Sequence, residues 1–116
     1  MPTRFLTTAQ RARFARLPQS LSEDDLVKAF TLDEADLSDI RNLRTAKNRL
    51  GYAVLLIGAR YVGAFPTSQH DVSSIIATYL RTQLSIDAHV SLEAYFSAPK
   101  TVERHIRAIR ERHGFV

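Results

Sequence analysis

The chain has 116 residues, of which 45% are hydrophobic and 24% charged, with a formal net charge of +4 and no cysteine. This length fits one domain with a single core, and the composition argues against a disordered tail. The lack of thiols excludes disulfides, thiolate metal sites and a cysteine nucleophile. We therefore expect residues 1–116 to form a single domain.

The first residues, MPTRFLTTAQRARF, are charged and contain no apolar run of signal-peptide length. The longest apolar run of the chain, interrupted by Gly58, is too short to span a bilayer. We expect a cytoplasmic protein that has no contact with a membrane.

Charge is segregated along the sequence. The stretch from Ser22 to Asp39 holds seven of the twelve acidic residues but only one of the sixteen basic residues, which leaves fifteen bases and five acids elsewhere. Such a molecule permits an anionic partner such as nucleic acid on its basic side.

The spacing of apolar residues and of capping residues predicts helices along the whole chain and no strand. In chain order, these helices cover about 8–17, 22–30, 31–44, 48–62, 72–84, 87–96 and 100–113. The helix over 48–62 is apolar on nearly every face, as expected for a helix surrounded by others. We predict an all-α fold, a compact bundle of about six or seven helices around this central helix.

Several helix starts have more than one candidate cap. The helix over 31–44 begins with either Thr31 or Asp33 as its N-cap, and Ser68 has capping-box spacing for the helix over 72–84. The short helix over 87–96 takes either Asp87 or Ser85.

No catalytic or metal-binding constellation stands out. The sequence has no phosphate-binding glycine loop and no nucleophile elbow, and Asp33, Glu34 and Asp36 are better explained as capping residues than as metal ligands. We predict no enzyme activity and no cofactor or metal, and we expect His105 and His113 to lie at the surface. Zinc-site spacing is missing among the four histidines, His70, His89, His105 and His113.

Cations flank the central helix. Arg49 and Arg60 are eleven residues, or about three turns, apart and therefore lie close to one stripe of the helix. A cation near the C-terminal end, such as Arg60, suits the helix dipole, whereas Lys47 and Arg49 near the N-terminal end do not. Lys47 and Arg49 would then either pair with the neighbouring acidic helices or contact phosphate.

The same segment, AKNRLGYAVLLIGARYVG, resembles a signature near the N-terminus of the Tn-three family of replicative transposases. The match consists of an Asn-Arg-Leu-Gly-aromatic-Ala run at 48–53 and an Arg-aromatic-x-Gly run at 60–63. The segments LTTAQRARFARLP, FTLDEADLSDIRNLR and ERHIRAIRERHGF resemble further parts of that N-terminal region in the same order. The resemblance thus covers nearly the whole chain.

The resemblance implies a helical DNA-binding domain that contacts the terminal inverted repeats of a transposon. It also implies that the strand-cutting acids lie in a larger C-terminal domain, for which this chain is too short. The expected partners are double-stranded DNA and the remainder of the transposase chain, with no small-molecule substrate. The alternative is an interaction or assembly module of the transposase that has no direct contact with DNA.

The expected DNA contacts form two groups, one around the central helix and one on the last helix. Most should touch phosphates, because base recognition needs an element inserted into a groove. Asn48 is the candidate for base recognition, and its alternative role is that of an N-cap. The residues are Arg44, Lys47, Asn48, Arg49, Arg60, Arg104, Arg107 and Arg110.

Overall fold

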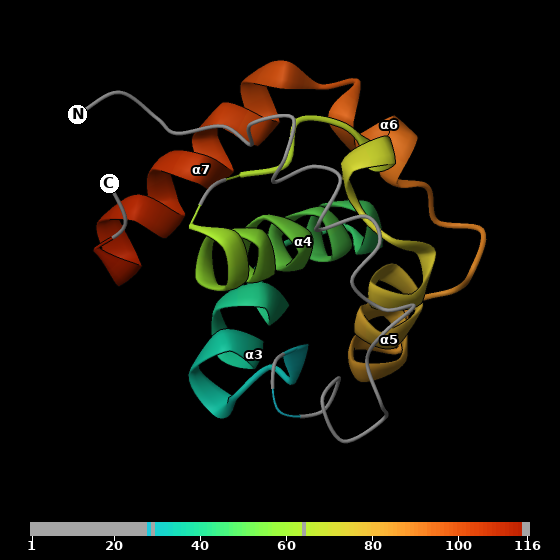
Figure 1. Ribbon diagram of the computed structural model, residues 1–116, viewed down its shortest axis with the longest axis horizontal. Helices are drawn as coiled ribbons and strands as arrows, with labels where there is room; N and C mark the ends of the chain where they lie inside the picture. Colours follow the sequence, from blue (N-terminus) through green and yellow to red (C-terminus); the bar gives the residue numbers. More distant parts are fainter. Residues whose placement is uncertain (1–27, 29, 64, 115–116) are drawn as a thin grey trace.

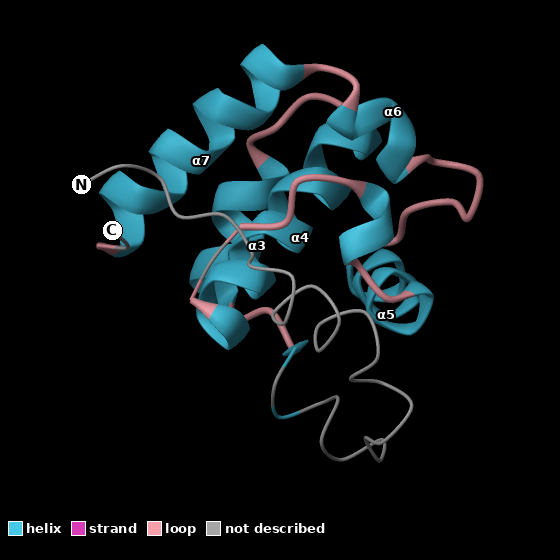
Figure 2. Cartoon of the chain, turned by 45° about the horizontal axis from the view of Figure 1, so that its top comes forward, coloured by secondary structure: helices cyan, strands magenta, loops and turns pink. Residues whose placement is uncertain are grey.

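A computed structural model describes residues 28, 30–63 and 65–114, which form five α-helices and one short 3-10 helix (Figure 1). None of these residues forms a strand (Figure 2), so the all-α prediction is confirmed. The predicted helix over 8–17 lies outside the described residues, as does the helix over 22–30 apart from residues 28 and 30. The elements are α3 (Glu34–Arg41), α4 (Ala46–Val62), η2 (Gln69–Asp71), α5 (Ser74–Leu84), α6 (Leu92–Phe96) and α7 (Pro99–His113).

Helix α4 is the centre of the molecule, with the other helices arranged around it (Figure 1). It contacts α3, α5, α6 and α7, and every residue from 50 to 59 is buried. This confirms the prediction of a central hydrophobic helix and explains why its apolar residues are not confined to one face. No helix in the described part of the chain is long and apolar enough to cross a membrane.

The link between α3 and α4 is a short turn. Asp33 is the N-cap of α3 and forms a capping box with Asp36, which decides between Thr31 and Asp33. The predicted helix over 31–44 is too long, because α3 ends at Arg41 and Thr45 already caps α4. Arg44 consequently lies in the turn and not in a last helical turn.

Two later helix starts also differ from the sequence-based prediction. Helix α5 begins after Ser73, which caps it, whereas Ser68 caps the separate 3-10 helix η2. Helix α6 is capped by Ser91, so neither Asp87 nor Ser85 is its cap. Ser85 instead terminates α5 in the left-handed conformation, at φ 55°.

The segment that precedes α3 is tied to α5 by a side-chain amide. Gln83 accepts a hydrogen bond from the Leu32 N–H at 2.7 Å and donates one to the Phe30 carbonyl at 3.1 Å. The ring of Phe30 is fully buried and packs on Tyr61 with their centroids 5.1 Å apart. These side-chain contacts attach residues 30–32 to α5 and α4.

Candidate nucleic-acid interface

Arg60, one of the predicted contact residues, joins α4 to α3. Its Nη1 and Nη2 atoms each donate a hydrogen bond of 2.6 Å to the carboxylate of Asp36, whose side chain is 1% exposed. Burial favours a raised pKa for Asp36, but hydrogen bonds from Arg60 and from the Asp33 backbone outweigh it and hold the pKa below its ordinary value. The bidentate pair fixes the geometry of both helices, so Arg60 has a structural role whatever else it touches.

Arg49 and Asn48 shape the start of α4. Arg49 Nε donates a hydrogen bond of 2.8 Å to the carbonyl of Leu43 in the connecting turn. The backbone N–H of Asn48 donates to the hydroxyl of Thr45 at 3.1 Å, which makes Thr45 the N-cap and excludes that role for Asn48. Arg49 therefore pairs with a carbonyl and, among the described residues, with no acidic side chain.

Arg44 and Lys47 lie at the same end of α4. Arg44 is exposed in the turn and Lys47 is half-buried in the first helical turn, which contains no acidic residue. The positive end of the helix dipole adds to these two side chains. The N-terminal end of α4 is thus a local positive region, here called the α4 start.

Helix α7 presents a basic face to solvent and an apolar face to the core. Lys100, Arg104 and Arg107 are exposed, while Ile106 and Ile109 are buried. The hydrogen bond that Arg104 forms with a described side chain is a long one, 3.5 Å from Nη2 to the Thr101 hydroxyl. This arrangement agrees with the helical spacing of the sequence, and we call the exposed residues the α7 face.

Of two other cations of α7, one is less accessible and one is ion-paired. Arg110, a predicted contact residue, is half-buried. Arg112 Nε lies 3.0 Å from the carboxylate of Asp39 and so joins the end of α7 to α3. The structure does not bring all basic residues of this helix to one free surface.

His105 is buried, so its predicted surface position is wrong, whereas His113 is half-buried. His105 Nδ1 and the Tyr95 hydroxyl share a hydrogen bond of 2.7 Å, and the imidazole meets Tyr52 edge to face. Burial, helped by the charge of Arg104, lowers the pKa of His105 to about 4. Burial also raises the pKa of the Tyr95 hydroxyl. The histidine is therefore a neutral core residue near pH 7.

Gly51 makes room for the same tyrosine. A Cβ atom at this position would overlap the ring of Tyr95, which packs directly on the α4 backbone. The C-terminal glycine of the motif, Gly63, ends α4 with φ at 75°, a conformation that favours glycine. Gly51 and Gly63 of the matched runs are thus explained by the packing and termination of α4.

The described residues contain no group of three histidine, cysteine or acidic side chains that could hold a metal ion. Asp33 and Asp36, weighed above as metal ligands or capping residues, form the capping box of α3. The chemistry available on these surfaces is electrostatic attraction and hydrogen bonding to an anionic partner.

Comparison with known proteins places the chain in a family. Residues 5–116 match the family described as "Domain of unknown function (DUF4158)". The chain belongs to the DUF4158 family. No solved structure matches the sequence.

The relatives of this DUF4158 domain are transposases. It is 32% identical over 115 residues to the transposase for transposon gamma-delta of Escherichia coli (strain K12), covering 99% of this chain and 12% of that protein. It is also 32% identical over 111 residues to the transposase for transposon Tn1546 of Enterococcus faecium, covering 96% of this chain and 11% of that protein. The chain therefore spans about one tenth of the length of the curated relatives that it matches.

A third relative, the transposase for transposon Tn21 of Escherichia coli, is 44% identical over 64 residues, or 54% of this chain and 6% of that protein. The matches fall in the N-terminal regions of Tn-three family transposases, which confirms the resemblance seen in the motif of α4. The DUF4158 domain described here is a transposase domain.

Three structural features of this DUF4158 domain were missed at the sequence level. The burial of His105 had a local signal, because His105 lies three residues after Val102 and four before Ile109, on the apolar face of α7. The ion pairs Asp36–Arg60 and Asp39–Arg112 had none, since their partners are 24 and 73 residues apart in the sequence.

Proposed function

We propose that this domain binds the double-stranded DNA of transposon ends, the terminal inverted repeats, mainly through phosphate contacts. The observation that carries the proposal is the α7 face, where Arg104 and Arg107 are exposed and have no carboxylate partner among the described residues. Exposed guanidinium groups on one side of a rigid helix suit phosphates, since arginine presents a fork of donors that matches a phosphate oxyanion.

The α4 start is the second part of the proposed surface, with Arg44 and Lys47 as its available cations. The other candidates, Asn48, Arg49, Arg60 and Arg110, stay in the proposal, but Arg49 and Arg60 already serve the fold. Substitution of those two residues changes stability together with charge, so the proposal is tested first on the α7 face.

We propose no catalytic step for this domain. The domain is proposed to hold transposon DNA for strand-cutting acids elsewhere in a longer transposase, and that remaining part of the protein is its second proposed partner. Support comes from the one-tenth coverage of transposase relatives.

A competing function, assembly of the transposase without DNA contact, rests on one exposed apolar position. Ile75 is 43% exposed on α5 and adjoins the half-buried Tyr79, beside a shallow groove. Such a patch suits a protein partner better than a phosphate backbone. We rank this function second because it concerns one large apolar side chain.

The two functions differ in their response to salt and to charge removal. We expect duplex DNA carrying the inverted repeat to bind with an affinity that falls steeply with salt. The double substitution Arg104→Gln with Arg107→Gln should make the slope of log K against log salt shallower by about 1.8, since each lost phosphate contact contributes about 0.9. Fluorescence anisotropy at several salt concentrations measures both quantities.

The matched control is Ile75→Ser, which should leave DNA affinity unchanged. DNA binding through the α7 face is rejected if the affinity for duplex DNA does not change with salt and the double arginine variant binds as tightly as the unchanged chain. Loss of self-association or of transposase binding in Ile75→Ser would then favour the assembly function.

A further inference from the structure

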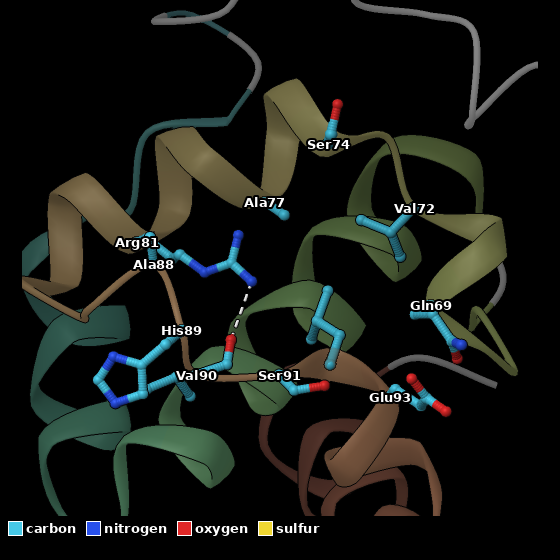
Figure 3. Close-up of a pocket in the computed structure, with 11 residues that line it drawn as sticks. Gln69, Val72, Ser74, Ala77, Arg81, Ala88, His89, Val90, Ser91 and Glu93 are labelled. Atoms are coloured by element: carbon cyan, nitrogen blue, oxygen red, sulfur yellow. Dashed lines mark hydrogen bonds between the residues drawn. The ribbon is translucent and has the colours of Figure 1, made fainter.

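An open pocket of about 380 Å³, here called the cavity, lies between α5, η2 and the segment over 88–93 (Figure 3). Its walls come from three parts of the chain, and Arg81 projects from the last turns of α5 toward it. The other polar residues that line it are Gln69, Ser74, His89, Ser91 and Glu93. None of these residues belongs to the α4 start or to the α7 face.

Arg81 is a half-buried cation without a carboxylate partner among the described residues. Its Nη2 atom donates a hydrogen bond of 2.9 Å to the carbonyl of Val90, while its Nε–H is buried and unpaired within the same part of the chain. A carbonyl oxygen leaves the guanidinium charge uncompensated, and a partly desolvated charge without a counter-charge is costly.

Two other arginines of the bundle show the contrast. Arg60, with a side chain 33% exposed, is paired with Asp36, and Arg112 is paired with Asp39. Both of these arginines have an acid of α3 as partner, whereas the half-buried Arg49, like Arg81, has a carbonyl partner. Arg81 also lines the cavity.

Glu93 on the cavity wall and Asp87 next to it in the chain form no ion pair with Arg81. Glu93 is exposed and lies across the cavity on the side of Gln69 (Figure 3), and it forms no ion pair with Arg81. Asp87 lies 3.9 Å from His89 with both side chains exposed to solvent. Arg81 and Glu93 thus both line the cavity without pairing with each other, and hydroxyl and amide groups lie around them.

We propose that this cavity is a phosphate-binding site in which Arg81 holds the oxyanion. A guanidinium donates two parallel hydrogen bonds to phosphate. The hydroxyl of Ser91, which caps α6, and the amide of Gln69, 3.3 Å from the His70 ring, are further possible donors on the cavity wall. Donors from several directions suit a tetrahedral phosphate better than a planar carboxylate. In the intact complex the phosphate belongs to the DNA backbone, a step that rests on the proposed function.

The first experiment titrates the 116-residue chain with inorganic phosphate and follows backbone amide signals by two-dimensional NMR. Saturable shifts are expected at Gln69, Val90 and Ser91. They should vanish in Arg81→Gln and persist in Arg81→Lys, which keeps the charge. Arg41→Gln, which removes an exposed cation outside the cavity, should leave them unchanged.

Two results would reject phosphate binding by Arg81. Without saturable shifts, or with equal shifts in Arg81→Gln, the cavity does not bind phosphate through Arg81. Acetate that produces the same shifts at lower concentration than phosphate would assign the cavity to a carboxylate and reject a phosphate ligand. Circular dichroism of each variant confirms that the helices are retained.

The second experiment decides where the phosphate comes from. Arg81→Gln should weaken binding of the inverted-repeat duplex about tenfold and make its salt slope shallower by about 0.9. If phosphate shifts the NMR signals but this variant binds duplex normally, the site binds free phosphate and its assignment to DNA is wrong. If the unchanged chain binds no duplex at all, the proposed function fails, while the phosphate titration still decides the cavity.

Discussion

Because Gly51 has no side chain, α6 can pack closely against α4. The ring of Tyr95 in α6 lies against the α4 backbone where any other residue would carry a Cβ atom. The tyrosine hydroxyl, in turn, reaches His105 of α7. One glycine therefore sets the position of a ring that connects three helices.

Replacement of Gly51 by alanine tests this contact. Alanine stabilises the interior of a helix by about 1 kcal/mol relative to glycine, but overpacking against Tyr95 should cost about 1–3 kcal/mol. We expect net destabilisation in urea unfolding. The second change Tyr95→Leu should make Gly51→Ala less harmful than it is alone, and a stabilising Gly51→Ala would contradict the proposed overlap.

At the scale of elements, the ion pair of Asp36 and Arg60 holds α3 against α4. Arg60→Gln removes two hydrogen bonds from a carboxylate that stays buried, so we expect a loss of about 1–2 kcal/mol, allowing for the exposure of the arginine. The second change Asp36→Asn should recover part of the lost free energy of unfolding, measured by urea unfolding at pH 7.

The same pair has a signature in acid. Because the pKa of Asp36 lies below its ordinary value of 3.8, its contribution to stability is complete above about pH 4 and is lost as pH falls through the lower, folded-state pKa. Asp36→Asn should flatten the stability curve in that window. An unchanged curve in the variant would show that the pair does not stabilise the fold.

The contact between α6 and α7 should lose stability at a less acidic pH than the ion pair of Asp36 and Arg60. His105 has a pKa of about 4 in the fold against 6.5 when exposed, so the unfolded chain binds the proton first as pH falls. Stability is therefore full above pH 6.5 and declines toward pH 4, by roughly 2–3 kcal/mol at 1.36 kcal/mol per pKa unit. Thermal unfolding across this range measures the decline.

His105→Asn is the matched variant, because it keeps an acceptor near the Tyr95 hydroxyl but cannot be protonated. Its stability should vary less between pH 6.5 and 4 than that of the unchanged chain. Since His70, His89 and His113 remain in both proteins, the difference isolates His105. Equal slopes would indicate that His105 is protonated in the fold.

Local patterns predicted these elements better than their ends and contacts. The apolar run of α4 and the Gly114 that ends α7 were recognisable because hydrophobic periodicity and left-handed glycine caps are local signals. The start of α5 was misplaced, since Ser68 and Ser73 are equally good caps until η2 is known. The cavity at Arg81 was not predictable, because it joins η2, α5 and residues 88–93.

For the whole molecule, the arrangement of cations matters more than their number. The chain carries a formal charge of +4, but Arg60 and Arg112 are matched by acids of α3. The cations that remain available among the described residues include those of the α4 start and the α7 face. The long-range attraction for an anionic partner thus comes from a subset of the arginines and lysines.

If the α4 start and the α7 face grip one duplex, their contributions to the salt slope should add. Arg44→Gln with Lys47→Gln, and Arg104→Gln with Arg107→Gln, should each make the slope shallower by about 1.8, and the fourfold variant by about 3.6. Anisotropy titrations at several salt concentrations give these values. A fourfold slope no shallower than that of one double variant would mean that only one region contacts the DNA.

The side chain of Gln83 has a consequence for how the bundle opens. The Leu32 amide hydrogen is held by a side-chain oxygen of α5, and the Phe30 carbonyl is bound by the same amide group. Exchange of the Leu32 hydrogen with solvent deuterium therefore requires α5 to move or Gln83 to change rotamer. Exchange at the Leu32 amide therefore reports on the detachment of α5 from the segment before α3, although Leu32 and Gln83 are 51 residues apart in the sequence.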